Sequence, residues 1–432
     1  MAGRVPGAGA AAVPAGQRAT SSGPPIPGQA ILLALATFGF ISATNILTPL
    51  LPQVRDDLGV SITTAGLIVG SYGVARLIDD LPAGFLAERV GHRRLSVIGV
   101  VLLVASSLFG WQAGSVEMLI AARVGSGAAV GVLATVSLSA LAATASNATR
   151  GKVMSLFHVA NNTGIAVYPI LGGLIGAVVG WRPTFLVSAV LAVFAGAIML
   201  VLLPRIDFSH AGSRGGRDDE TRVLHGRPRT IAFAVTNFGV VANMIHRHGV
   251  RNTILPLYAA TALGLGGVSI ATAIALMAIT GLLVATPGGM LGDRIGRRRV
   301  IVAGLSAIAV GDLVFLLTHD LLTFLVVAAL IGLGDFFTSS QTALLSEIVP
   351  ARERTRALST YRFSADLGAI LGPIVLASVM DAANAQAAII AASVILASAA
   401  LAARFLVPAR VDASEPAGTV SAEAAEADAT AA

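Results

Sequence analysis

The residues best suited to chemistry in this sequence are charged side chains that interrupt apolar runs of roughly 20 residues, a length that can cross a bilayer. A charge inside a bilayer costs about 2.5–3.5 kcal/mol on insertion scales, so such residues line a cavity or pair with one another. A buried carboxylate can also hold a proton near neutral pH and release it when its surroundings change. We therefore expect proton coupling at Asp335, Asp79 and Asp80.

Asp335 is the first choice among these residues. It lies in the segment IGLGDFFTSS, about 21 Å from the outer end of its apolar run at 1.5 Å per residue. The alternative is a structural role, in which Asp335 accepts a hydrogen bond from a neighbouring helix.

Polar residues within the apolar runs predict a cavity for a substrate. Arg247 and Arg251 are four residues apart and share one face of a helix, where together with Arg123 they favour an anionic or polar substrate. The alternative is that these arginines act in gating or extend to the membrane surface. His246 and His248 are two residues apart and point in different directions, so we expect no metal site. The expected cavity residues are Asn45, Asn243, His246, Arg247, Arg251 and Gln341.

Twelve apolar segments must position these residues. The chain is 55% hydrophobic and 12% charged, whereas soluble globular chains average about 25% charged residues. We therefore expect an all-α membrane protein with twelve transmembrane helices in two pseudo-symmetric six-helix bundles. The expected spans are 29–51, 61–84, 95–114, 117–144, 152–178, 182–204, 230–258, 268–290, 299–318, 321–347, 357–380 and 384–406.

The composition also argues against several functions. The chain has no cysteine, which excludes disulfides and thiolate chemistry. Its pI of 10.6 does not indicate a nucleic-acid partner, because the basic residues lie in loops between the spans. No nucleophile–base or metal-ligand set stands out, so we expect neither an enzyme nor a cofactor.

The placement of arginine predicts the topology. One set of loops holds nearly all basic loop residues, among them Arg93 and Arg298, whereas the other set holds only Arg55, Arg182 and His319. By the positive-inside rule the first set is cytoplasmic, which places both termini on the inner side of the plasma membrane.

This topology divides the chain into five parts. We expect two disordered cytoplasmic tails, the second of them acidic, and a cytoplasmic linker between two bundles. The expected boundaries are a tail at 1–28, a bundle at 29–204, the linker at 205–229, a bundle at 230–407 and a tail at 408–432.

A short phrase occurs twice at half-chain spacing. Residues 82–94 read PAGFLAERVGHRR and residues 287–299 read PGGMLGDRIGRRR, with corresponding positions 205 residues apart. An Asn-x-x-x-Pro-Leu sequence begins at Asn45 and recurs 207 residues later, at Asn252. Two homologous halves in one membrane chain are typical of transporter architecture.

These motifs resemble those of the major facilitator superfamily. The repeated phrase is similar to the family's signature loop G-x-L-a-D-R-x-G-R-R, with Glu88 in place of the usual Asp in the first copy. Arg123 begins RVGSG, which is similar to an R-x-x-x-G motif linked in the family to proton coupling. Residues 164–173 are similar to the antiporter motif G-x-x-x-G-P-x-x-G-G, except that Tyr168 replaces a glycine. The resemblance covers nearly all of residues 29–407.

The resemblance implies a proton-coupled secondary active transporter that exports small organic molecules as an antiporter by alternating access. Two alternatives stay open: an importer or facilitator of a sugar or organic anion, and a non-transporting membrane sensor of the same fold. The implied partners are a small-molecule substrate, protons and the lipid bilayer, with the chain acting as a monomer.

In the family fold the second and eleventh spans face each other, which implies a gate that closes the cytoplasmic side in the outward-facing state. Helix rise places Arg76 and Asp366 about 18 Å from the cytoplasmic ends of their spans, and Asp80 and Arg362 about 12 Å. The equal depths predict pairs of Arg76 with Asp366 and of Arg362 with Asp80, or with Asp79. Local pairs along each helix are the alternative. The expected gate comprises Arg76, Asp80, Arg362, Asp366, Glu88, Arg89, Asp293 and Arg294.

Overall fold

The computed structural model describes residues 26–79, 89–146, 149–206, 208, 224, 226–350 and 353–408. In these residues the chain is entirely helical, as predicted, and helices lie at all twelve expected spans. Most of the two expected tails, much of the expected linker, and Asp80 and Glu88 lie outside the described residues.

The first bundle contains spans one to six. Its first span bends twice and has three helical parts, whereas each of the next four spans is a single helix in the described residues. The elements are α1 (Gly28–Asn45), η1 (Thr48–Leu50), α2 (Leu51–Leu58), α3 (Ile62–Asp79), α5 (His92–Trp111), α6 (Val116–Thr144), α7 (Arg150–Val179), α8 (Pro183–Leu202) and η2 (Leu203–Arg205).

The second bundle contains spans seven to twelve. Two of its spans are interrupted, one by a ten-residue π-helix and one by a short 3₁₀ turn. The elements are α9 (Gly226–Met244), the π-helix η4 (Ile245–Ile254), α10 (Leu255–Ala262), α11 (Gly267–Ile295), α12 (Arg297–Phe315), α13 (Leu321–Gly334), the 3₁₀ turn η5 (Asp335–Phe337), α14 (Thr338–Ile348), α15 (Arg354–Ala382) and α16 (Ala385–Leu406).

The helices have the composition and surface of membrane spans. Nine of those in the described residues are long and apolar enough to cross a bilayer. Large apolar side chains stand on their outer surface, for example Val178 with 84% and Phe405 with 75% of its surface exposed. Since such surface is unfavourable in water, these side chains face lipid in a multi-pass integral membrane protein.

Local sequence explains where several spans begin. Ser115 caps α6, Asn384 caps α16, and the Asp320 carboxylate accepts a 2.9 Å hydrogen bond from the amide of Thr323 at the start of α13. That hydrogen bond lowers the pKa of Asp320 below its ordinary value.

One glycine of the repeated phrase is required by the conformation of the backbone. Gly91 and Gly296 occupy equivalent positions in the two copies and have φ angles of 88° and 100°, directly before α5 and α12. Side chains with a Cβ atom disfavour this conformation, so glycine is the residue best suited to the turn.

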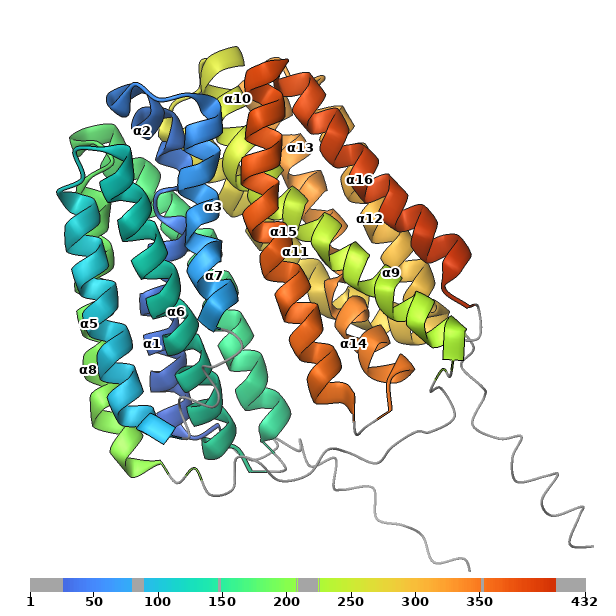
Figure 1. Cartoon of the computed structure of the whole chain (residues 1–432), viewed down its shortest axis with the longest axis horizontal. Coiled ribbons are helices and arrows are strands. Elements are labelled where there is room, and N and C mark those ends of the chain that lie inside the picture. Colours follow the sequence, from blue (N-terminus) through green and yellow to red (C-terminus); the bar gives the residue numbers. More distant parts are fainter. Residues whose placement is uncertain are drawn as a thin grey trace, which may run out of the picture.

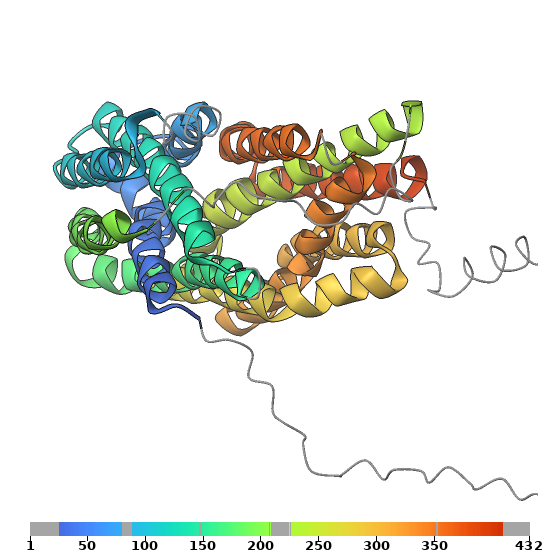
Figure 2. The ribbon, with the colours of Figure 1, turned by 90° about the horizontal axis from the view of Figure 1, so that it is seen from below.

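The two bundles meet at one end of the molecule and diverge at the other. In Figure 1 they converge at the end that carries α2 and α10 and separate toward α14, and Figure 2 shows them side by side from that second end. The contacts between bundles are made mainly by α3 with α15 and by α7 with α11. Small residues permit this approach: a Cβ atom at Gly66 would lie 2.4 Å from the Pro373 carbonyl oxygen.

The substitution Gly66→Val should prevent the bundles from meeting at the α2/α10 end. Overpacking at such a contact costs about 1–3 kcal/mol, which favours separation of α3 from α15. Spin labels at Gln112→Cys and Ala383→Cys, in a chain that has no other cysteine, should then report longer distances than in the parent.

Gly114→Val is the matched control, because a Cβ atom at Gly114 meets nothing within 4 Å. An unchanged label distance in Gly66→Val, or an equal change in the control, would contradict this packing.

Candidate functional site

A cavity of about 240 Å³ lies between the two bundles. Both halves line it: α3, α6 and the bend after α1 contribute from the first bundle, and η4 and α15 from the second. Apolar side chains such as Leu47, Leu51, Ile68 and Val69 form part of its wall. Its polar lining residues are Thr48, Tyr72, Arg76, Arg123, His248, Asn252 and Asp366.

Arg123 is buried at the cavity wall. Its guanidinium donates a 2.8 Å hydrogen bond to the carbonyl oxygen of Ala43 and lies 4.8 Å from the centre of the Tyr72 ring. Only 5% of Arg123 is exposed. The helices α1, α3 and α6 thus hold its side chain in one place.

An ion pair at the cavity wall joins the two halves of the molecule. Arg76 on α3 lies 3.6 Å from the carboxylate of Asp366 on α15. The structure thus brings together two residues that sequence reasoning placed at equal depth. Asp366 is buried and Arg76 is half-exposed, so the pair lies at the boundary between the cavity and the contact of the bundles.

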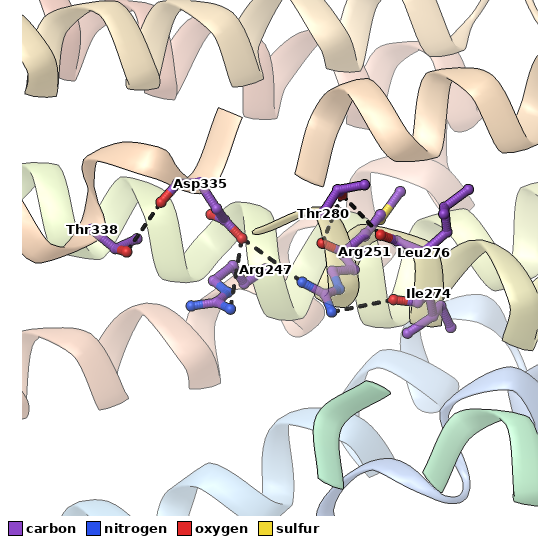
Figure 3. Close-up of polar contacts among 8 residues, drawn as sticks. Arg247, Arg251, Ile274, Leu276, Thr280, Asp335 and Thr338 are labelled. Atoms are coloured by element: carbon purple, nitrogen blue, oxygen red, sulfur yellow. Dashed lines mark hydrogen bonds and ion pairs between the residues drawn. The ribbon is translucent and has the colours of Figure 1, made fainter. Parts of the chain in front are cut away.

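A second charged cluster lies within the C-terminal half and is drawn in Figure 3. The Asp335 carboxylate is 3.7 Å from the guanidinium of Arg247 and 4.0 Å from that of Arg251. Arg251 also donates a 3.4 Å hydrogen bond to the carbonyl oxygen of Ile274 on α11. The expected common face of Arg247 and Arg251 is therefore present, and one carboxylate serves both cations.

Breaks in two helices create this cluster. Asp335 begins the 3₁₀ turn η5 between α13 and α14, and both arginines lie in the π-helix η4 between α9 and α10. One carboxylate oxygen of Asp335 accepts no hydrogen bond within the described residues. Interruptions of regular helix concentrate at functional positions, because they turn side chains and backbone groups into directions that a continuous helix cannot offer.

His248 joins the cluster to the cavity. It lines the cavity, and it is within electrostatic range of Arg247, Arg76, Arg251 and Arg123. Four arginines from three helical elements therefore act on the same imidazole.

His246 points elsewhere, although we expected it in the cavity. Its Nδ1 lies 2.9 Å from a carboxylate oxygen of Asp312 on α12, and both side chains are buried. The reason is its register in η4, where residues two apart leave the helix in different directions. The interaction connects the seventh span to the ninth inside the second bundle.

The other expected cavity residues also lie outside the cavity lining. Asn45 ends α1 and Asn243 lies in α9, and both are buried. Gln341 is buried on α14, where its side-chain oxygen accepts a 3.4 Å hydrogen bond from Tyr361. In the described residues, the cavity wall contains none of the six residues that we expected there.

The expected gate residues on the repeated loop lie at the α14 end. Arg297 joins Asp293 four residues earlier, at 2.5 Å, to Glu347 on α14, at 3.1 Å. Arg89, Arg294 and Arg362 have exposed side chains. Asp79 is the last residue of α3, and its side chain lies outside the described residues, as do Asp80 and Glu88. The pairing expected for Arg362 therefore stays a prediction.

Sequence reasoning did not place Thr48, Tyr72, His248 and Asn252 in the cavity. Two signals were available. His248 is a basic residue within a span, and Asn252 is the second copy of the repeated Asn-x-x-x-Pro-Leu sequence. Neither signal predicts whether the side chain points into the cavity, because that direction depends on the π-helix.

Removal of either member of the His246–Asp312 pair should reduce stability. We expect His246→Ala and Asp312→Ala each to lower the free energy of unfolding by about 1–3 kcal/mol, since each leaves a buried polar partner unsatisfied. The double variant should lose less than the sum of the two, as measured by detergent-induced unfolding. Asp56→Ala, which removes an exposed partner of Arg55, should cost about 0–1 kcal/mol. Additive losses at His246 and Asp312 would show that the two side chains do not interact.

Comparison with known proteins finds proteins that are described as transporters or exporters. The chain is 23% identical over 365 residues to an uncharacterised MFS-type transporter of Methanocaldococcus jannaschii, covering 81% of this chain and 91% of that protein. It is 33% identical over 159 residues to a cephamycin export protein of Amycolatopsis lactamdurans, covering 37% of this chain and only 33% of that protein. The fold is similar to the crystal structure of a POT peptide transporter in complex with sulfate, with a TM-score of 0.74, 16% identity and coverage of 89% and 95%.

The family assignment rests on a match that extends over both bundles. The sequence pattern described as "Major Facilitator Superfamily" matches residues 33–247 and 248–430. This match, together with the two bundles and the cavity between them, shows a secondary transporter and not an enzyme. The chain belongs to the Major Facilitator Superfamily.

Proposed function

We propose that the protein couples the movement of a small organic molecule to protons by alternating access, with Asp335 as the proton-binding carboxylate. The observation that carries this proposal is the position of Asp335 between Arg247 and Arg251 at interruptions of two spans. When ionised, Asp335 compensates part of the charge of both arginines. When protonated, it leaves their charge uncompensated, and because both arginines act on His248 at the cavity, the electrostatic potential there changes. A proton that binds Asp335 therefore alters the affinity of the cavity for a charged or polar substrate.

The distribution of arginine supports an orientation for the two ends. The arginine-rich repeated loop lies at the α14 end, which the positive-inside rule assigns to the cytoplasm. The bundles meet at the opposite, α2/α10 end. On this assignment the structure is the inward-facing form, and both termini are cytoplasmic.

The Arg76–Asp366 pair supports a gating role at the centre of the molecule. It joins the two halves while they are apart at the α14 end. We expected Arg76 and Asp366 in the cytoplasmic gate, but the pair is formed while the α14 end is open, so we assign it to the contact that a transport cycle must break when the α2/α10 end opens. The loop residues Asp293, Arg294 and Arg89 stay in the contact that closes the α14 end.

Export is the direction that we favour. The antiporter-like motif of the fifth span and the 33% identity to part of a cephamycin export protein support it. One observation favours a second candidate, import together with a proton: protonation of Asp335 leaves Arg247 and Arg251 uncompensated, which strengthens the binding of an acidic substrate. The direction in which protons move with the substrate separates the two.

Transport by the purified full chain in proteoliposomes with an imposed pH gradient tests the proposal. Benzylpenicillin, glucose and ethidium serve as acidic, neutral and cationic probes. We expect the parent to move at least one probe faster with the gradient than without it, and Asp335→Asn to lose this acceleration because its side chain cannot be deprotonated. Asp56→Asn, at an exposed site, is the control and should behave as the parent.

An internal pH dye gives the sign of the coupling. Protons that move against the probe indicate the antiport of an exporter, and protons that accompany it indicate co-transport. Gradient-driven transport that is unchanged in Asp335→Asn, or that is absent from the parent for all three probes, would refute the proposal.

A further inference from the structure

We propose that the substrate is a small organic anion whose acidic group binds Arg123 in the central cavity. The inference rests on the proposed transport function and names the class of molecule that it serves. It does not depend on the direction of transport.

Arg123 is a buried cation without a carboxylate partner in the described residues. Its guanidinium has five N–H donors, of which one hydrogen bond, to Ala43, is present, and its Nε–H has no partner among the described residues. The ring of Tyr72 offsets part of the charge. Burial of an ion costs several kcal/mol unless a counter-ion compensates it, so the site is suited to an anion that arrives from outside the chain.

The carboxylates near the cavity are already paired with other arginines and do not compensate the charge of Arg123. Asp366 is paired with Arg76, and the single carboxylate of Asp335 serves both Arg247 and Arg251. In and beside the cavity, the described residues therefore supply four guanidinium groups and two carboxylates. The cavity is therefore positive, and a cavity with apolar walls strengthens that field.

The opposite wall of the cavity offers further polar contacts. His248 and Asn252 of η4 belong to the second bundle, whereas Arg123, Tyr72 and Thr48 belong to the first. An acidic group held by Arg123 and approached by His248 or Asn252 would bridge the two halves. A ligand with contacts to both halves shifts the balance between the forms in which the halves are close and apart.

The size and lining of the cavity limit the rest of the ligand. A volume of 240 Å³ corresponds to about eight water molecules at their liquid volume. Leu47, Leu51, Ile68 and Val69 supply apolar contacts. A carboxylate or phosphonate with a short apolar body fits this combination of one buried cation, a few polar side chains and an apolar wall.

Matched acidic and neutral compounds test the proposal by their effect on thermal unfolding of the detergent-solubilised full chain. The pairs are benzoate with benzamide, hexanoate with hexanamide, and phenylphosphonate with its dimethyl ester, at constant pH and ionic strength. We expect at least one acid to raise the unfolding temperature of the parent, with no comparable effect of its neutral partner. In Arg123→Gln the acid concentration for half-maximal stabilisation should rise about tenfold or more, because a charge-assisted contact is lost.

Two further variants keep the result interpretable. Arg404→Gln makes the same change at an exposed arginine on α16 and should respond as the parent does. Asn252→Asp adds a negative charge to the opposite wall without changing the size of the side chain, and it should abolish the response to acids even if Arg123→Gln does not fold.

The proposal fails if no acid stabilises the parent more than its neutral partner does, or if the acid response is unchanged in Arg123→Gln or in Asn252→Asp. This binding assay uses no pH gradient. Gradient-driven transport that is absent from the parent, or that is unchanged in Asp335→Asn, together with an intact acid response would therefore refute proton coupling alone. Gradient-driven transport that behaves as expected without an acid response would refute the anion site alone.

Discussion

The cost of holding charge in a low-dielectric membrane is the constraint on which the rest of this structure depends. The chain meets that cost by joining helices. Asp366 and Arg76 connect the two bundles, and Asp335 connects η5 to the two arginines of η4. The first pair joins the two halves of the molecule, whereas the second lies within one half, so charge is neutralised both between the bundles and inside one of them.

Interrupted helices make the Asp335 cluster and the contact of His246 with Asp312 possible. Within η4, His246 reaches Asp312 inside the second bundle, Arg247 reaches Asp335, and His248 reaches the cavity. Three consecutive residues thus contact three different parts of the molecule. The i→i+5 hydrogen bonds of the π-helix widen the turn, and this local geometry distributes the polar side chains of the seventh span between structure and site.

Much of the fold and less of the site could be predicted. All twelve spans were predicted, because the length of an apolar run is a property of the local sequence, although the first span extends to Leu58 and not to residue 51. The contact of Arg76 with Asp366 was predicted from equal depth together with the family resemblance. Membership of the cavity was not predicted: His246 and Gln341 lie inside the second bundle, and His248 and Asn252 line the cavity instead. Depth along a helix follows from counting residues, whereas direction around it depends on the type of helix and on its neighbours.

The sequence by itself determined the class of protein, the number of spans, the two related halves and the charged residues that lie deep in the membrane. These properties follow from composition, periodicity and repetition, which are read along the chain. Only the tertiary structure decided which of the charges meet, which cation is left without a carboxylate in the described residues, and which end of the molecule is closed. Those outcomes depend on distances of 3–4 Å between residues far apart in sequence, such as Arg76 and Asp366 at 3.6 Å, and such distances exist only when helices have packed.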